Sequence, residues 1–114
     1  MSDVIKTVKA DLKHSNRPVA RCLHKGKGFK VLVVGMYKGM SMHDHKTNVS
    51  TTLTVLEGSL YYNNGHSSTL LQQYEDFAIP TAEMHSIESV DDCLFLLTQG
   101  KKIQAWEAAD DELT

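Results

Sequence analysis

The strongest strand signal in the chain is the stretch FKVLVVGMY, from Phe29 to Tyr37. β-Branched and apolar residues dominate it and glycines lie on both sides, which is typical of a strand packed against a core. Lys38 and Gly39 end the stretch. On its N-terminal side, Val19 to His24 predicts a shorter strand, with a glycine-containing turn between the two.

On the C-terminal side, short apolar or threonine-rich segments alternate with Gly, Asn and Pro. Strands are predicted at residues 51–57, 60–62, 69–71, 76–79, 85–90 and 93–98, with a further segment at 43–45. The stretch from Asn63 to His66 predicts a hairpin turn, because Asn-Gly tolerates the positive φ values of a type I′ turn. About nine short strands without a βαβ rhythm predict an all-β sandwich or barrel.

The two ends of the chain are less regular. Residues 4–13 carry both periodicities, with apolar residues at helical spacing and also in loose alternation. We expect residues 1–18 to form an edge strand and an arm, because Pro18 excludes a central strand. Residues 101–114 are rich in Ala and Glu and could form a short helix with Trp106 packed on the barrel.

Length and composition indicate one globular domain, residues 1–114. The formal net charge of −2 argues against nucleic acid or an anionic membrane as a partner. No apolar run approaches the roughly 20 residues of a membrane span, and no signal-peptide pattern is evident. Cys22 and Cys93 lie in apolar sequence and predict buried, reduced thiols. A cytoplasmic location is therefore expected.

Two histidines mark the candidate functional site. His43 and His45 are two residues apart, so on a regular strand both imidazoles lie on one face and can share a metal ion. Six histidines in 114 residues give roughly 0.3 such pairs by chance, so the pair alone is weak. Its context strengthens it, because a strand precedes it, another follows, and Pro80 and His85 come later as a possible third ligand.

In this context the sequence resembles the cupins, over about residues 28–98. Their first motif is matched by Gly39, His43, His45 and Gly58, and their second by Pro80 and His85, five residues apart as in the family. The resemblance implies a small, single-domain, bacterial-type, RmlC-like cupin, which is an all-β jelly-roll barrel (double-stranded β-helix). It also implies a metal or ligand site inside that barrel.

The chain departs from the cupin pattern at several motif positions. The glutamate position falls on Thr51, which by parity shares an inward face with Leu53 and Val55. The glycines of the second motif are replaced by Tyr74 or Glu75 and by Ala82, and its asparagine is replaced by Ser89. The resemblance therefore implies a three-histidine variant that lacks the motif glutamate.

This variant predicts a site in which His43, His45 and His85 hold a divalent metal (Zn, Fe, Ni or Cu), with Thr51, Leu53 and Tyr61 lining the pocket. Without the glutamate, the metal keeps its full charge and favours a small anionic molecule. The resemblance admits a dioxygenase-type activity. The alternative is a metal-free binding or sensor module, so both metal and turnover stay open. A homodimer is expected, because a small barrel leaves sheet edges and apolar outer faces to cover.

Overall fold

The computed structural model describes residues 2–100, with the backbone alone at Ser2, Asp44 and His45. Helix α1 precedes nine strands along this part of the chain. The bounds are α1 Ser2–Leu12, β1 Val19–Gly26, β2 Phe29–Met36, β3 Ser41–His45, β4 Thr51–Glu57, β5 Leu60–Asn63, β6 Ser68–Leu71, β7 Asp76–Ile79, β8 His85–Ser89 and β9 Cys93–Gly100. No helix among these residues is long and apolar enough to cross a membrane. The helix predicted within residues 101–114 lies outside the described residues.

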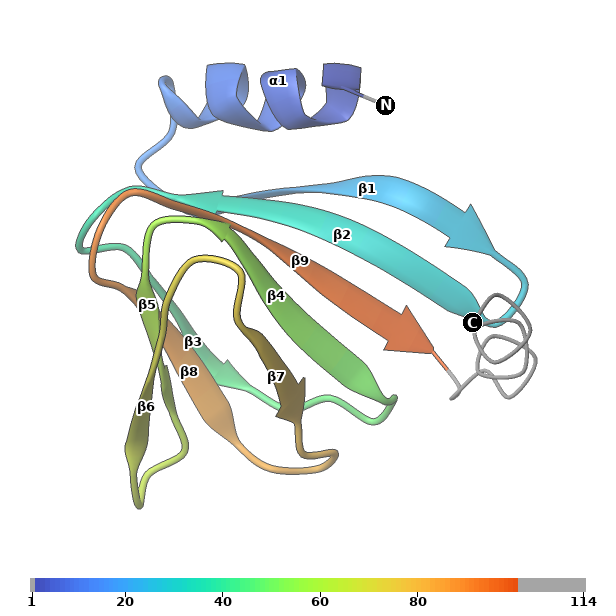
Figure 1. The fold of residues 1–114 in the computed structure, drawn as a ribbon, viewed down its shortest axis with the longest axis vertical. Helices are drawn as coiled ribbons and strands as arrows, with labels where there is room; N and C mark the ends of the chain where they lie inside the picture. The colour runs from blue at the N-terminus through green and yellow to red at the C-terminus, as the bar shows by residue number, and fades with distance from the viewer. Residues whose placement is uncertain (1, 101–114) are drawn as a thin grey trace.

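The strands form two antiparallel sheets that face each other (Figure 1). One sheet has the order β1-β2-β9-β4-β7, and the other has the order β3-β8-β5-β6. Apolar side chains from both sheets fill the space between them, among them Met36, Leu53, Tyr62 and Phe95. The predicted all-β jelly roll is confirmed, and the strands predicted from the sequence begin and end within about two residues of those observed.

Strand β4 shows how the inner face is built. Along it Thr51, Leu53 and Val55 are buried while the residues between them are half-buried, as alternation requires. Thr51 pairs with Gln99 on one side and with Ile79 on the other. Its neighbour Leu53 lies one row further into the sandwich, between Leu97 and Phe77. Thr51 therefore belongs to the outermost inward-facing row of this sheet.

The N-terminal segment is a helix, so the predicted edge strand is wrong. Val8 and Leu12, one helical turn apart, are buried, and Val4 and Ile5 pack beside them. These side chains lie on the outer face of the five-stranded sheet, where α1 crosses β1 and β2 (Figure 1). The β-branched residues favour a strand locally, but burial of a helical apolar stripe decides the outcome.

A glycine in β2 lets the helix approach the sheet closely. A Cβ atom at Gly35 would lie 2.8 Å from Val8 Cγ1 and 3.3 Å from Leu12 Cδ2. Two ion pairs, Lys9 with Glu57 and Asp11 with Arg21, also join helix and sheet. Their side chains are about half exposed, so the apolar contact carries most of the attachment.

Two further expectations need adjustment. Cys93 is buried as predicted, but Cys22 is exposed on β1, a strand with mostly exposed residues. The predicted hairpin joins β5 and β6, yet its loop has four residues, because Asn63 pairs with Ser68. Asn64 Oδ1 accepts hydrogen bonds from two backbone N–H groups in that loop, each 2.9 Å long.

Candidate functional site

Strands β3 and β8 bring the histidine segments together, with an irregularity in the register. Met42 pairs with Ile87 and His45 pairs with His85, so the two strands advance by three and two residues. This β-bulge breaks the strict alternation on which the prediction for the histidine pair depends. His45 and His85 are nevertheless direct backbone neighbours across the strands.

His43 lies apart from the interior of the barrel. Its side chain is exposed. It lines an open surface hollow of about 790 Å³, together with Arg17, Tyr37 and Lys38. Met42, just before the bulge, packs with the inner core and pairs with the buried Ile87, so His43 falls on the outer face. The structure thus places His43 and His85 in different surroundings.

His85 is buried, with 7% of its surface exposed. Its ring stacks on Tyr62, with centroids 5.2 Å apart and planes inclined by 27°. Its Nδ1 lies 3.1 Å from the backbone oxygen of Glu83. A carbonyl oxygen can only accept, so Nδ1 carries the proton in this bond. In the neutral ring, the lone pair is therefore on Nε2.

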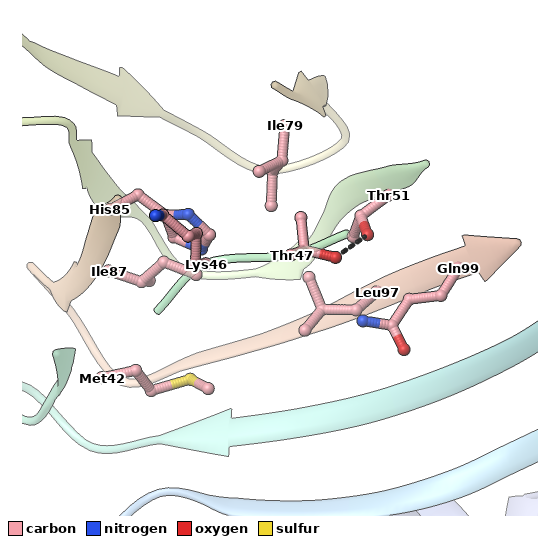
Figure 2. A pocket seen from close by; sticks show the side chains of 9 residues that line it. All are labelled: Met42, Lys46, Thr47, Thr51, Ile79, His85, Ile87, Leu97 and Gln99. Atoms are coloured by element: carbon pink, nitrogen blue, oxygen red, sulfur yellow. Dashed lines mark hydrogen bonds between the residues drawn. The ribbon is translucent and has the colours of Figure 1, made fainter. Parts of the chain in front are cut away.

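His85 lines a cavity of about 140 Å³ between the two sheets (Figure 2). Apolar side chains from both sheets form part of the cavity wall, and polar side chains lie between them. The described lining residues are Met42, Lys46, Thr47, Thr51, Ile79, His85, Ile87, Leu97 and Gln99. We call this cavity the barrel pocket. These residues include one lysine and no aspartate or glutamate.

Thr51 occupies the position that the sequence prediction gave it. It is 4% exposed and lines the barrel pocket. Its Oγ1 lies 3.2 Å from Thr47 Oγ1 and 3.1 Å from the backbone oxygen of Val49. These hydroxyls therefore hold the β3–β4 loop to the start of β4 while their oxygens border the pocket.

Two predicted pocket residues lie elsewhere. Leu53 is fully buried in the inner core, one row deeper than Thr51, and does not line the pocket. Tyr61 is exposed, because Leu60 and Tyr62 take the inward positions of β5. The inward tyrosine is therefore Tyr62, which packs against His85.

Two polar residues of the pocket, Lys46 and Gln99, were missed from the sequence. Gln99 follows Leu97 by two positions and pairs with Thr51, so strand alternation together with the sheet order identifies it. Lys46 directly follows the histidine pair, at the end of β3, where strand parity gives no information. A prediction of Gln99 required knowledge that β9 lies beside β4.

The described side chains supply one histidine for a metal in the barrel pocket. No group of three His, Cys, Asp or Glu among them is arranged to hold a metal ion. His45, for which the backbone alone is described, is outside that statement, so the set of His43, His45 and His85 stays a prediction. His85 itself fits a ligand position, since metal-binding histidines commonly donate their other N–H to a carbonyl.

Solved structures with the same architecture cover most of the chain. An RmlC-like cupin protein from Desulfovibrio desulfuricans matches 74% of this chain and 82% of its own, at a TM-score of 0.68 and 22% identity. A cupin superfamily protein from Desulfitobacterium hafniense matches 77% and 81%, with a TM-score of 0.70 and 14% identity. This chain has the cupin fold.

A third solved cupin-type structure is an uncharacterised protein from Klebsiella pneumoniae with a double-stranded β-helix domain. It matches 82% of this chain and 85% of its own, with a TM-score of 0.70 and 17% identity. No protein-family model matches the sequence, and no curated protein does. The likeness to the cupins therefore concerns the fold.

The cupin motif positions can now be compared with the backbone. Gly58 has a φ of 77°, and a Cβ atom there would overlap the carbonyl of Asp92. Two non-glycine residues in the described part of the chain also have positive φ, namely Tyr74 at 69° and Ala82 at 63°. Ala82 stands at one glycine position of the cupin pattern, and Tyr74 is one of the two residues, with Glu75, that match the other. Both residues therefore adopt a backbone conformation that glycine favours.

Proposed function

We propose that this protein binds a small anionic molecule in the barrel pocket. The observation that carries the proposal is the composition of the wall. It places Lys46, His85, Gln99 and two threonines around one cavity, with no carboxylate among the lining side chains that the structure describes. An ammonium group, an amide and hydroxyls can all donate hydrogen bonds to an anion.

The size of the pocket restricts the ligand class. A volume of about 140 Å³ corresponds to roughly five water molecules at liquid density. The cavity is smaller than the roughly 300–1,000 Å³ of sites for drug-sized ligands. The apolar wall formed by Ile79, Ile87 and Leu97 suits a short carbon chain. We therefore infer a carboxylate of a few carbon atoms as the ligand class.

The experiment is isothermal titration of the full chain with sodium malonate and with inorganic phosphate. Lys46→Ala should weaken malonate binding about tenfold or more, because it removes a charged donor from a partly desolvated site. His85→Ala should weaken it by a similar factor below about pH 6, where an ordinary imidazole is protonated and Nε2 also carries a hydrogen to donate. Lys38→Ala and His66→Ala are the matched controls, since neither residue lines the barrel pocket. Equal affinities in all four variants, or no binding of either anion, would refute the proposal.

A second candidate is a divalent metal bound by His85 with His45 and His43, as predicted from the sequence. It is supported by the donation of His85 Nδ1 to the Glu83 carbonyl and by the pairing of His45 with His85. The exposed position of His43 weighs against that residue as a ligand. When bound, a metal would supply a Lewis acid and a second positive charge for the anion.

Elemental analysis of protein purified without an affinity tag tests this candidate. Near-stoichiometric metal that is lost in both His43→Ala and His85→Ala would support all three ligands. Loss in His85→Ala alone would support a site without His43. Retention in both variants would reject it. Oxygen consumption with β-diketones and thiols then tests the dioxygenase-type activity, which stays a prediction.

A further inference from the structure

We propose that Tyr62 and Glu83 are positioning residues that hold the imidazole of His85 in one orientation and one tautomer. The consequence for ligand binding rests on the proposed function of the barrel pocket. The positioning itself rests on a chain of contacts among these three residues alone.

Each of the three residues contacts the other two. The Tyr62 ring stacks on the His85 ring at 5.2 Å, and the Tyr62 hydroxyl donates a 2.8 Å hydrogen bond to Glu83 Oε1. The backbone oxygen of the same Glu83 accepts from His85 Nδ1 at 3.1 Å. Glu83 therefore contacts the tyrosine through its side chain and the histidine through its backbone. Movement of Glu83 would displace both partners.

The loop that carries Glu83 is fastened to two other parts of the barrel. Residues 80–84 connect β7 to β8, which begins at His85. The N–H of Ala82 donates to the carbonyl of Thr47 at 2.7 Å, and Thr47 lines the barrel pocket. On the other side, Glu83 bonds Tyr62, and Asn64 Nδ2 lies 3.5 Å from Glu83 Oε2. Without the Glu83 carboxylate, the loop would lose these two hydrogen bonds, to Tyr62 in β5 and to Asn64 just after it.

Burial makes the bond between Tyr62 and Glu83 hard to replace. Tyr62 is 2% exposed, so its hydroxyl has little access to water. Burial, with the hydrogen bond and negative charge of Glu83, raises the pKa of Tyr62, which keeps the phenol protonated as a donor. A buried hydroxyl without a partner is costly. The tyrosine and the loop are therefore held in fixed relative positions.

These contacts determine which ring nitrogen of His85 carries the proton. Free histidine favours the tautomer with the proton on Nε2, whereas the bond to the Glu83 carbonyl requires it on Nδ1. The nitrogen that can then accept a proton, or bind a metal, is Nε2. Tyr62 and Glu83 thus determine which of the two ring nitrogens of His85 carries the hydrogen.

The test combines nitrogen-15 NMR of His85 at about pH 8.5, where an ordinary imidazole is neutral, with malonate titration. In the wild type we expect the Nδ1–H tautomer. Tyr62→Phe keeps the stacked ring, and Glu83→Ala removes the carboxylate. Both should raise the Nε2–H fraction. Because a neutral ring can donate to an anion from Nε2 only in that tautomer, both should also strengthen malonate binding at this pH about three- to tenfold, the range for one hydrogen bond. Glu83→Gln keeps an acceptor and should resemble the wild type.

Glu88→Ala is the control, because Glu88 is an exposed carboxylate on the same strand β8. An unchanged tautomer in Glu83→Ala, or an equal change in Glu88→Ala, would overturn the positioning role. A tautomer change without any malonate binding by the wild type would support the positioning role and reject the proposed function. Thermal unfolding of each variant identifies any loss of fold, and in that event Glu83→Gln decides the outcome by itself.

Discussion

Thr51 Oγ1 lies 3.2 Å from Thr47 Oγ1, and both threonines line the barrel pocket. Thr51 stands where the cupin pattern places a carboxylate. With this neutral hydroxyl, the described lining of the pocket has Lys46 as its charged residue at pH 7, with histidine counted as neutral. The difference between threonine and glutamate at this one position should therefore decide between an anion site and a cation site.

Thr51→Glu should reverse the preference of the pocket. A carboxylate at a position that is now 4% exposed would repel malonate and weaken its binding by at least about tenfold, because like charges in a partly desolvated site are unfavourable. The same variant should take up more divalent metal. Thr51→Gln is the control for side-chain volume, and titration calorimetry compares them. Equal malonate affinities in the Glu and Gln variants would contradict this prediction.

Because Val8 and Gly35 are in contact, substitutions at these two positions should have non-additive effects on the free energy of unfolding. Gly35→Ala places a methyl group 2.8 Å from Val8 Cγ1 and should lower the free energy of unfolding by about 1–3 kcal/mol. Val8→Ala should cost a similar amount through lost packing. The double variant should lose less than the sum of the two, because the smaller residue makes room for the methyl group. Urea unfolding measures all four proteins, and strict additivity would show that helix and strand are not in contact there.

The positive φ of Ala82 should lower the free energy of unfolding of the protein. A non-glycine residue in this region costs roughly 1–2 kcal/mol, which a glycine does not incur. Ala82→Gly should therefore be neutral or stabilising. Ala20→Gly, on the exposed strand β1, should destabilise by about 0.5–1 kcal/mol through chain entropy alone. If the two substitutions have the same effect in thermal unfolding, Ala82 is not strained.

Alkaline pH should weaken the fold through Cys93. Burial raises the pKa of the Cys93 thiol, although the hydrogen bond from Ser89 acts in the opposite direction. Because the folded-state pKa is above the unfolded value, this contribution is fully present below about pH 8.5 and is lost as the pH rises through the folded-state pKa. Above about pH 8.5, the free energy of unfolding should therefore fall more steeply with pH in the wild type than in Cys93→Ala.

The two thiols should also differ in reactivity. An aromatic disulfide reagent should modify Cys22 in the native protein and Cys93 only after unfolding, since one is exposed and the other is buried. Rapid native modification of Cys93 would contradict both statements about that residue.

The positions of the strands from residue 19 to residue 100 were readable from local sequence, because strand signals and turn residues act over a few positions. The helix was not. Val4, Val8 and Leu12 fit a helix and a strand nearly equally well, and the outcome depends on whether an outer sheet face with Gly35 is available. That information lies more than 20 residues away.

The site was predicted less well than the fold, for a reason of register. The spacing of His43 and His45 indicates a shared face only if alternation continues, and the bulge between Met42 and His45 interrupts it. Thr51 and His85 were placed correctly because β4 and β8 alternate regularly. Tyr61 was chosen over Tyr62 because nothing local distinguishes the two faces of β5.

Helix α1 has a consequence for assembly. It covers the outer face of the five-stranded sheet, where Val19 of β1, Val33 of β2 and Leu94 of β9 would otherwise be open to water. A second copy of the chain in the expected homodimer should therefore dock elsewhere, and sedimentation at micromolar concentration should give the same mass for the wild type and for Lys9→Ala. A chain without residues 2–12 would instead expose the apolar outer face of the five-stranded sheet to solvent and to other molecules. The helix thus protects the protein against aggregation, and its deletion should lower the solubility of the chain.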